Sequence, residues 1–319
     1  MIRNVVLLAG LVLVGVALAQ EGPPPDLASL PPLVRKSVLA KRTARFSGQR
    51  TVQFRHGPEV TKLVEFVWQD GPRTRIEFPE ASPYKGQIIV EDDHQRLHYY
   101  PDRNEIDVEP PRRMRPPRMV PAGEQKPKFT HVITTGGLVA GKQTQLVTVA
   151  DQSGNVMQRM WIEPHTGVML KRVLLDRGGS QRGYFEFTKI NFRPKFSPGD
   201  FKIERKGATL ITPVMQVQRL ALQKGLSLIV LPPSSEYQLE GARAMDREGQ
   251  DVLVQTYRGK SGRFQIFQVK GPINPERLRR FARGRLSTYS WMHGSESLAL
   301  VGELPETRLR ELARVLGDK

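Results

Sequence analysis

Short runs in which apolar and polar residues alternate constrain this chain more than any other feature, and they are clearest between residues 156 and 192. Three such runs, VMQRMWI, VMLKRVLL and YFEFTKINF, are separated by the segments Pro164–Gly167 and Asp176–Gly179. Glycine adopts the positive φ that tight hairpins need, and proline stops a helix. The pattern therefore predicts an antiparallel meander. A large meander without catalytic motifs indicates a binding surface.

The same two-residue period covers most of the chain before this meander. A helix is expected first, over residues 33–45, where Leu33, Val34, Val38 and Leu39 form a narrow apolar stripe. Strands are then expected at 46–56, 59–69, 73–79, 85–92, 96–101, 104–110, 129–135 and 142–151. Together with the three runs above, they predict one antiparallel meander of about ten or eleven strands with one apolar face.

A proline-rich, basic segment interrupts the strands between Pro110 and Lys128. Its proline density excludes a central strand or a helix, so we interpret it as an extended loop or lid at the sheet edge. Its basic cluster consists of Arg112, Arg113, Arg115 and Arg118. Two interpretations stay open, namely a loop that contacts an anionic ligand and a solvated insertion loop.

The pattern of apolar and polar residues changes after residue 203. Residues 204–226 are interpreted as a linker with some apolar content, and residues 227–319 as a small α+β domain. Within that domain, strands are expected at 228–231, 238–245, 251–258 and 263–270, then a helix at 274–284, two more strands and a helix over 303–316. The sequence thus predicts two domains, a large one over residues 33–203 and this smaller one.

The N-terminus has the pattern of a cleavable export signal. Arg3 provides a positive start, residues 5–18 are almost wholly apolar, and Ala17-Leu18-Ala19 is a small-x-small cleavage site. We expect a signal peptide over residues 1–19, cleavage after Ala19, a proline-rich leader at 20–32, and a periplasmic or secreted protein. The alternative is an uncleaved N-terminal anchor. With no cysteine in the chain, disulfides, cysteine nucleophiles and thiolate metal sites are excluded.

The chain is strongly basic, with 49 Lys and Arg against 32 Asp and Glu and a net charge of +17. Such an excess favours anionic partners. Nucleic acid is not the obvious anionic partner of an exported protein, so we expect the partner to be an amphipathic anionic lipid or an acidic protein segment. We expect any contact with the membrane to be peripheral. The alternative is that the positive charge reflects a compositional bias toward arginine and not the binding of a ligand.

Motifs for catalysis or metal binding are weak. His94 and His98 lie four residues apart beside Asp92 and Asp93, but in a turn that enters a strand and without further ligands at a recognisable spacing. The chain has no Gly-x-Ser-x-Gly nucleophile motif and no phosphate-binding loop followed by a helix. We therefore expect a protein that is not an enzyme and that holds no metal or cofactor.

Several of these phrases together resemble the family of the outer-membrane lipoprotein carrier LolA. The resemblance rests on the leading helix, on RTRIEFP and GQIIVEDDHQRLHYYPDRNEI, and on the passage from Trp161 through Pro164-His165-Thr166-Gly167 to Asn191 and the ending FRPKFSPGDFKI. It covers residues 33 to about 203, and its motifs are strand-and-turn phrases. The additional C-terminal domain is similar to that of the two-domain RseB/MucB family of periplasmic sigma-factor regulators.

The resemblance implies an α+β protein with an N-terminal antiparallel half-barrel, a covering helix and a smaller C-terminal α+β domain. Apolar residues on the concave face would then bind acyl chains: Phe66, Trp68, Ile76, Phe78, Met160, Ile162, Met169, Val173, Phe185 and Phe187. It further implies a lipid or lipoprotein sensor that binds the extracytoplasmic segment of an anti-sigma factor and modulates envelope-stress signalling. Two alternatives are a lipid or lipoprotein carrier without a signalling role, and an envelope structural protein whose sheet is fully packed.

Overall fold

The computed structural model describes residues 27–56, 59–111, 129–247, 250–273 and 286–318. They form two compact units, one made of residues up to 104 with 111 and 129–207, the other of 105–110 and 208–318. The expected signal peptide and most of the expected leader lie outside the described residues, as do the four arginines of the 110–128 segment and the expected helix at 274–284. No helix within the described ranges is long and apolar enough to cross a membrane.

The first unit is a long antiparallel sheet led by one helix, α2 (Pro32–Thr43). Its strands are β1 (Arg45–His56), β2 (Glu59–Asp70), β3 (Arg73–Glu77), β4 (Ile88–Glu91), β5 (Arg96–Tyr100), β7 (Thr130–Val139), β8 (Lys142–Ala150), β9 (Val156–Ile162), β10 (Met169–Leu175) and β11 (Gln181–Asn191). They are neighbours in the order β5-β4-β3-β2-β1-β11-β10-β9-β8-β7. The sequence pattern predicted each of these strands within a few residues, and the α+β fold class is confirmed.

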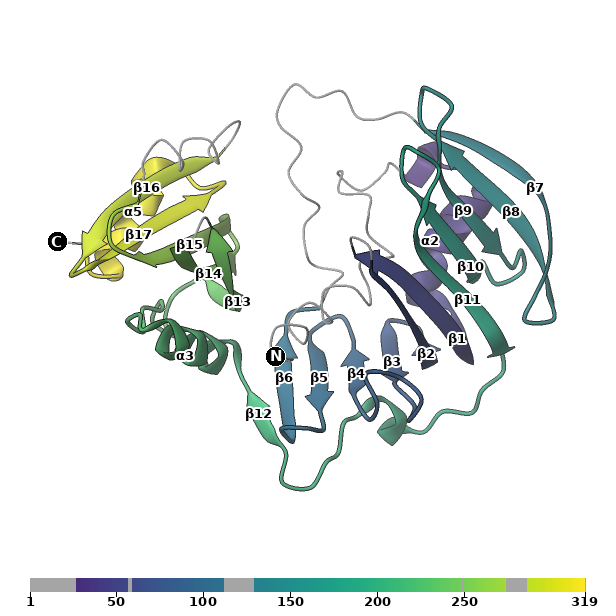
Figure 1. Ribbon diagram of the computed structural model, residues 1–319, viewed down its shortest axis with the longest axis horizontal. Coiled ribbons are helices and arrows are strands. Elements are labelled where there is room, and N and C mark those ends of the chain that lie inside the picture. The colour runs from purple at the N-terminus through teal and green to yellow at the C-terminus, as the bar shows by residue number, and fades with distance from the viewer. Residues whose placement is uncertain (1–26, 57–58, 112–128, 248–249, 274–285, 319) are drawn as a thin grey trace. The chain divides into compact units, whose positions relative to one another are not determined.

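Helix α2 lies against one face of this sheet, as Figure 1 shows for the part near β9–β11. Near its start Val34 packs with apolar residues of β8 and β9, and near its end Ala40 joins the larger core cluster of β1, β2 and β3. The Pro164–Gly167 turn meets the helix in between. Gly167 has a φ of +74°, and a Cβ there would lie 2.9 Å from the backbone oxygen of Lys36, so only glycine permits this approach.

A two-residue turn fixes which side chains share a face on β2 and β3. Asp70 pairs with Arg73 across Gly71, which has a φ of +59°, and Pro72. Counting back from this turn places Val67 opposite Ile76, and both are buried on the side that α2 covers. Since successive residues of a strand point to opposite faces, their neighbours in sequence project from the other side of the sheet.

The second unit is built on a five-stranded sheet in the order β13-β14-β15-β17-β16. The strands are β13 (Gln238–Arg247), β14 (Gln250–Gly259), β15 (Gly262–Lys270), β16 (Ser287–His293) and β17 (Glu296–Gly302), all paired antiparallel. Helix α5 (Glu306–Val315) buries Leu309, Leu312 and Ala313 against one face. The smaller α+β unit expected in the C-terminal part of the chain is thus present.

The stretch from 204 to 226 is more structured than a linker. It contains the short strand β12 (Thr209–Ile211), which pairs parallel with β6 (Glu105–Glu109), and the helix α3 (Pro213–Lys224). The Arg219 guanidinium donates two hydrogen bonds to the Glu105 carboxylate, at 3.0 and 2.7 Å, and so ties α3 to β6. Residues 208–226 therefore belong to the body of the second unit.

The strand expected at 228–231 is not formed, although two of its residues, Ile229 and Leu231, are buried. Side chains rather than a neighbouring strand satisfy this backbone: Gln255 donates to the carbonyl of Ile229 at 2.8 Å, and the amide of Leu231 donates to the Tyr257 hydroxyl at 3.2 Å. Ile229 and Leu231 are only 8% and 7% exposed. An apolar run indicates burial, and burial here does not require a sheet partner.

Removing the N-cap of α3 should destabilise the second unit. The Thr212 side chain accepts a hydrogen bond from the amide of Met215, and Thr212→Ala leaves that amide without it. We expect the free energy of unfolding to fall by about 1 kcal/mol, measured by urea denaturation. Thr212→Asn, which keeps a capping oxygen, is the matched control and should unfold close to the native chain. Equal losses in both variants would contradict the capping role.

Candidate binding face

The α2-covered face of the large sheet is the first candidate site. It carries two apolar clusters formed by alternate residues of the strands. Its larger cluster combines buried residues of α2, β1, β2, β3, β4, β7, β10 and β11 with neighbouring loops: Ala40, Phe46, Val52, Phe54, Leu63, Val67, Ile76, Phe78, Ile89, Val139, Val168, Leu170 and Phe187. A second cluster, around Val34, lies over β8 and β9.

Most of the residues predicted to contact a lipid lie on this face. Buried among the apolar clusters are Ile76, Phe78, Met160, Ile162 and Phe187, while Met169 and Phe185 are partly buried and pack against the same clusters. The structure thus brings together residues that are more than a hundred positions apart in the chain. That this face takes up acyl chains remains a prediction.

Three of the predicted residues project from the opposite face. Phe66 pairs with Glu77 and Trp68 with Arg75 across the β2–β3 ladder, one position out of phase with the buried Val67–Ile76 pair. Val173 is likewise out of phase with buried Leu170 and Arg172. All three are half-buried. The α2-covered positions on β2 are instead Leu63, Glu65, Val67 and Gln69, whose mixed polarity hid them from the sequence pattern.

A buried ion pair lies within the apolar face and was not anticipated. Glu65 is 0% exposed, and its carboxylate accepts a hydrogen bond of 2.7 Å from the Nε of Arg50. The Arg50 guanidinium also lies 5.3 Å from the ring centre of Phe185 and 5.9 Å from that of Phe187. Burial raises the pKa of Glu65 above its ordinary value of 4.5, although the charge of Arg50 and its hydrogen bond act in the opposite direction.

A second buried cation lies across the same face on β10. Arg172 is 6% exposed and donates two hydrogen bonds to the side-chain oxygen of Gln158, at 2.9 and 2.6 Å. Burial lowers the pKa of Arg172 to about 10, so it is charged at neutral pH. By register the buried ion pair of Arg96 and Glu91, at 3.3 Å, also lies on this face, which therefore combines apolar area with buried charged groups of both signs. This mixture fits an amphipathic anionic ligand better than a hydrocarbon.

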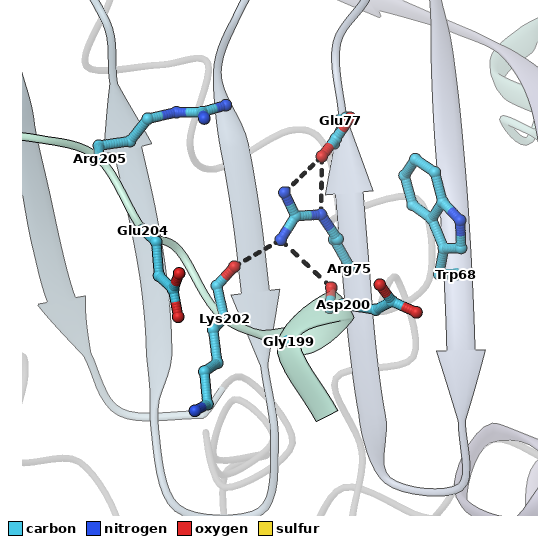
Figure 2. Close-up of a pocket in the computed structure, with 8 residues that line it drawn as sticks. All are labelled: Trp68, Arg75, Glu77, Gly199, Asp200, Lys202, Glu204 and Arg205. Atoms are coloured by element: carbon cyan, nitrogen blue, oxygen red, sulfur yellow. Dashed lines mark hydrogen bonds and ion pairs between the residues drawn. The ribbon is translucent and has the colours of Figure 1, made fainter. Parts of the chain in front are cut away.

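The opposite face carries a polar cavity of about 310 Å³, which Figure 2 shows. Its wall is formed by side chains of β2 and β3 and by the segment 199–205. The Arg75 guanidinium is fully engaged there, since it donates to Glu77 at 2.7 Å, to the carbonyl of Lys202 at 2.7 Å and to that of Asp200 at 3.2 Å. Because acidic and basic side chains balance, this cavity suits a polar ligand and not an acyl chain.

The histidines that were weighed as metal ligands have ordinary structural surroundings. His94 lies exposed in the turn before β5, where its amide donates to Asp92. His98 is 1% exposed on β5, where its ring packs 4.1 Å from that of Tyr100 and its Nε2 is 2.9 Å from the side-chain oxygen of Gln87. Their positions, one in the turn and one inside the core, separate the two imidazoles.

Comparison with known proteins finds likeness at the level of fold. No family model matches the chain, and no curated protein matches it. Among solved structures, a MucA/MucB complex from Pseudomonas aeruginosa contains a chain that is 13% identical, with 88% of this chain and 95% of that chain covered and a TM-score of 0.40. A conserved, uncharacterized protein from Thermus thermophilus is 16% identical over 56% of this chain and 96% of that chain, with a TM-score of 0.39.

A LolA superfamily protein from Nitrosomonas europaea is 7% identical, with 54% of this chain and 96% of that chain covered and a TM-score of 0.27. The likeness to the MucB complex extends over most of this chain, whereas the other two extend over little more than half.

Proposed function

We propose that this protein is a periplasmic binding protein without catalytic activity, in which the α2-covered face takes up an amphipathic anionic lipid or a lipoprotein. We further propose that it binds the extracytoplasmic segment of a membrane anti-sigma factor, and that lipid changes its affinity for that segment. The proposal of export rests on the N-terminal sequence. Regulation requires a coupling free energy between the two ligands of about 1–3 kcal/mol.

The observation that carries the lipid proposal is the light attachment of α2 to a large apolar surface. The helix itself buries only Val34, Ser37 and Ala40. Burying a valine contributes about 1.5 kcal/mol and an alanine less, so separating the helix from the sheet requires little energy from hydrophobic contacts. The sheet face beneath is far more apolar than the helix that covers it. A ligand with acyl chains that replaces α2 on that surface must also offset the hydrogen bonds that hold the helix, from Gln69 to the carbonyls of Ala40 and Lys41 and from Lys36 to that of Pro164.

The partner proposal comes from the RseB/MucB resemblance and from the presence of a second folded unit. A crystal structure of MucB has been solved in complex with MucA(peri). A plain carrier has no evident need for an additional α+β unit, and for this reason a signalling role is favoured over a lipoprotein carrier. The carrier remains the second candidate because the apolar face would serve it equally well.

The experiment that tests this proposal begins with the protein purified from its own envelope. Native mass spectrometry should detect the chain with bound lipid or lipoprotein, and capture with the tagged protein should recover a single-span anti-sigma factor. Lipid without the anti-sigma factor would favour the carrier. A ligand-free chain that captures neither would overturn both candidates and leave a structural role.

Loosening the end of α2 should increase lipid uptake. The Gln69 side chain donates to the carbonyls of Ala40 at 3.2 Å and Lys41 at 2.7 Å, so Gln69→Leu leaves the last helical carbonyls without this donor. We expect a loss of about 1–3 kcal/mol in unfolding free energy, faster amide hydrogen exchange in α2 and more retained lipid. Gln53→Leu, on the opposite face, is the matched control. Faster exchange in α2 without additional lipid would count against α2 as the cover of the site.

A further inference from the structure

Strand β7 ends the order of the large sheet, and within the described part of the chain it pairs only with β8. The register runs from Thr130 opposite Ala150 to Val139 opposite Lys142. In an antiparallel ladder, alternate residues direct their N–H and C=O groups toward the neighbour, and the others direct them away. Alternate residues of β7 therefore present backbone donors and acceptors along the outer edge of the sheet.

The first six residues of β7, here called the free edge (residues 130–135), lack the features that usually protect such a strand. Their sequence is THVITT, with no proline and no Lys, Arg, Asp or Glu, and consists mainly of β-branched residues. Natural edge strands are commonly blunted by charges, prolines or bulges. By contrast, β13 at one end of the five-stranded sheet carries Glu240, Arg243 and Asp246 and a bulge next to Gly241.

The free edge has a definite length. A register shift between Thr135 and Gly137 interrupts the β7–β8 ladder, and Val139 beyond it is buried in the large core cluster. Before that point two large apolar side chains are exposed to solvent on opposite faces of the strand, Val132 with 57% and Ile133 with 39% of its surface. This length matches a short extended peptide that would place apolar side chains beside each of them.

The charge around the free edge selects for an acidic occupant. On the face that carries Val132, the row continues through Thr148 of β8 to Arg159 of β9, which is exposed and has no carboxylate partner among the described residues. The whole chain carries a net charge of +17. An extended segment with alternating apolar and acidic residues would complement both the side chains and the charge.

From this arrangement we propose that residues 130–135 bind an extended, acidic segment of a partner polypeptide as an additional antiparallel or parallel strand. The inference rests on the proposed function in one respect: the natural segment would belong to the anti-sigma factor. Main-chain hydrogen bonds would supply affinity, and contacts with Val132 and Ile133 would supply specificity. No movement of α2 is needed for this strand to form.

The test uses the full chain and a synthetic decapeptide of alternating valine and glutamate, with a valine–lysine decapeptide as the control. Hydrogen exchange at single-residue resolution should show alternate amides of the free edge slowed at saturating acidic peptide and unchanged with the basic one. Val132→Glu should weaken binding of the acidic peptide about tenfold through like-charge repulsion and lost apolar contact. Val60→Glu, at a site of similar exposure on β2, should leave binding unchanged.

Each contrary outcome has a definite meaning. Absence of binding, or protection on another segment such as β13, would overturn the inference. Sedimentation of the peptide-free protein should show a monomer, since a dimer with the free edge protected would mean that a second copy of this chain is the occupant. If the anti-sigma segment is captured but leaves the free edge unprotected, only this inference fails. If that segment is not captured, the proposed function fails. Binding of the acidic decapeptide to the free edge still tests this inference independently.

Discussion

Replacing Arg50 with methionine should lower the free energy of unfolding by about 3–5 kcal/mol at neutral pH. Methionine fills a similar volume, so the main change is electrostatic: the fully buried Glu65 carboxylate loses the guanidinium that faces it at 2.7 Å. Removing one partner of a buried pair leaves an uncompensated charge, which is more destabilising than never having had the pair. Chemical denaturation at pH 7 measures the effect.

The size of this effect should depend on pH in a definite direction. Burial holds the pKa of Glu65 in the folded chain above 4.5, and loss of Arg50 removes the two interactions that lower it. A raised folded-state pKa means that the folded chain binds the proton more tightly, so stability falls as pH rises from 4.5 toward the folded pKa. Arg50→Met should therefore cost least below pH 4.5, where Glu65 is neutral in both states, and most at neutral pH.

The double variant Arg50→Met/Glu65→Leu is the control for this experiment. It removes both charges and keeps the face filled, and apolar replacements of buried pairs are often neutral or stabilising. We expect it to recover most of the stability lost in the single variant and to lose the pH dependence between 4.5 and the folded pKa. A double variant as unstable as Arg50→Met would show that lost packing, and not the unpaired carboxyl group, causes the damage.

Phe264→Ala should have a comparable effect on the second unit, about 3–5 kcal/mol. Phe264 is 1% exposed and lies between two tyrosines: it stacks on Tyr257 at 5.2 Å between ring centres and meets Tyr237 edge-on at 5.1 Å. Truncation removes both ring contacts and leaves a cavity in the cluster beneath α5. Calorimetry should show the transition of the second unit shifted to lower temperature.

The matched control is Leu222→Ala on α3, because Leu222 is 81% exposed and alanine favours a helix. It should change stability by less than about 0.5 kcal/mol. If the two units unfold independently, Phe264→Ala should leave the transition of the first unit in place. A single transition that moves as a whole would mean that the units unfold cooperatively.

The strands of the large sheet could be predicted because their signals are local. Alternation and turn residues identify each strand without knowledge of its neighbour, and the same holds for the extent of α2. The expected apolar stripe of the helix was wrong: its buried residues are Val34, Ser37 and Ala40, whereas Leu39 is 47% exposed. The helix α3 was overlooked although its boundaries are marked, by Thr212 and Pro213 at the start and by Gly225 with a φ of +60° at the end. These capping residues are the local signal for a helix within residues 204–226.

The face of the sheet from which each side chain projects was harder to predict, because it depends on the register between strands. The aromatic Phe66 and Trp68 suggested the wrong phase for β2, where burial follows Val67 and the polar Gln69. The two-residue turn at Gly71 and Pro72 would have resolved it, since pairing Asp70 with Arg73 places Val67 opposite Ile76. The sequence of this hairpin therefore contains the information that fixes the face of each side chain.

The Gln69 side chain has a structural consequence. Its single amide group donates to the carbonyls of Ala40 and Lys41 in α2 and, at 3.2 Å, to that of Gly71 in the β2–β3 turn. The Gln69 side chain therefore links the end of the helix to the turn through hydrogen bonds. Next to Gln69, on the other side of the sheet, Trp68 forms part of the wall of the polar cavity. Two adjacent residues of β2 thus contact α2 on one side of the sheet and line the polar cavity on the other.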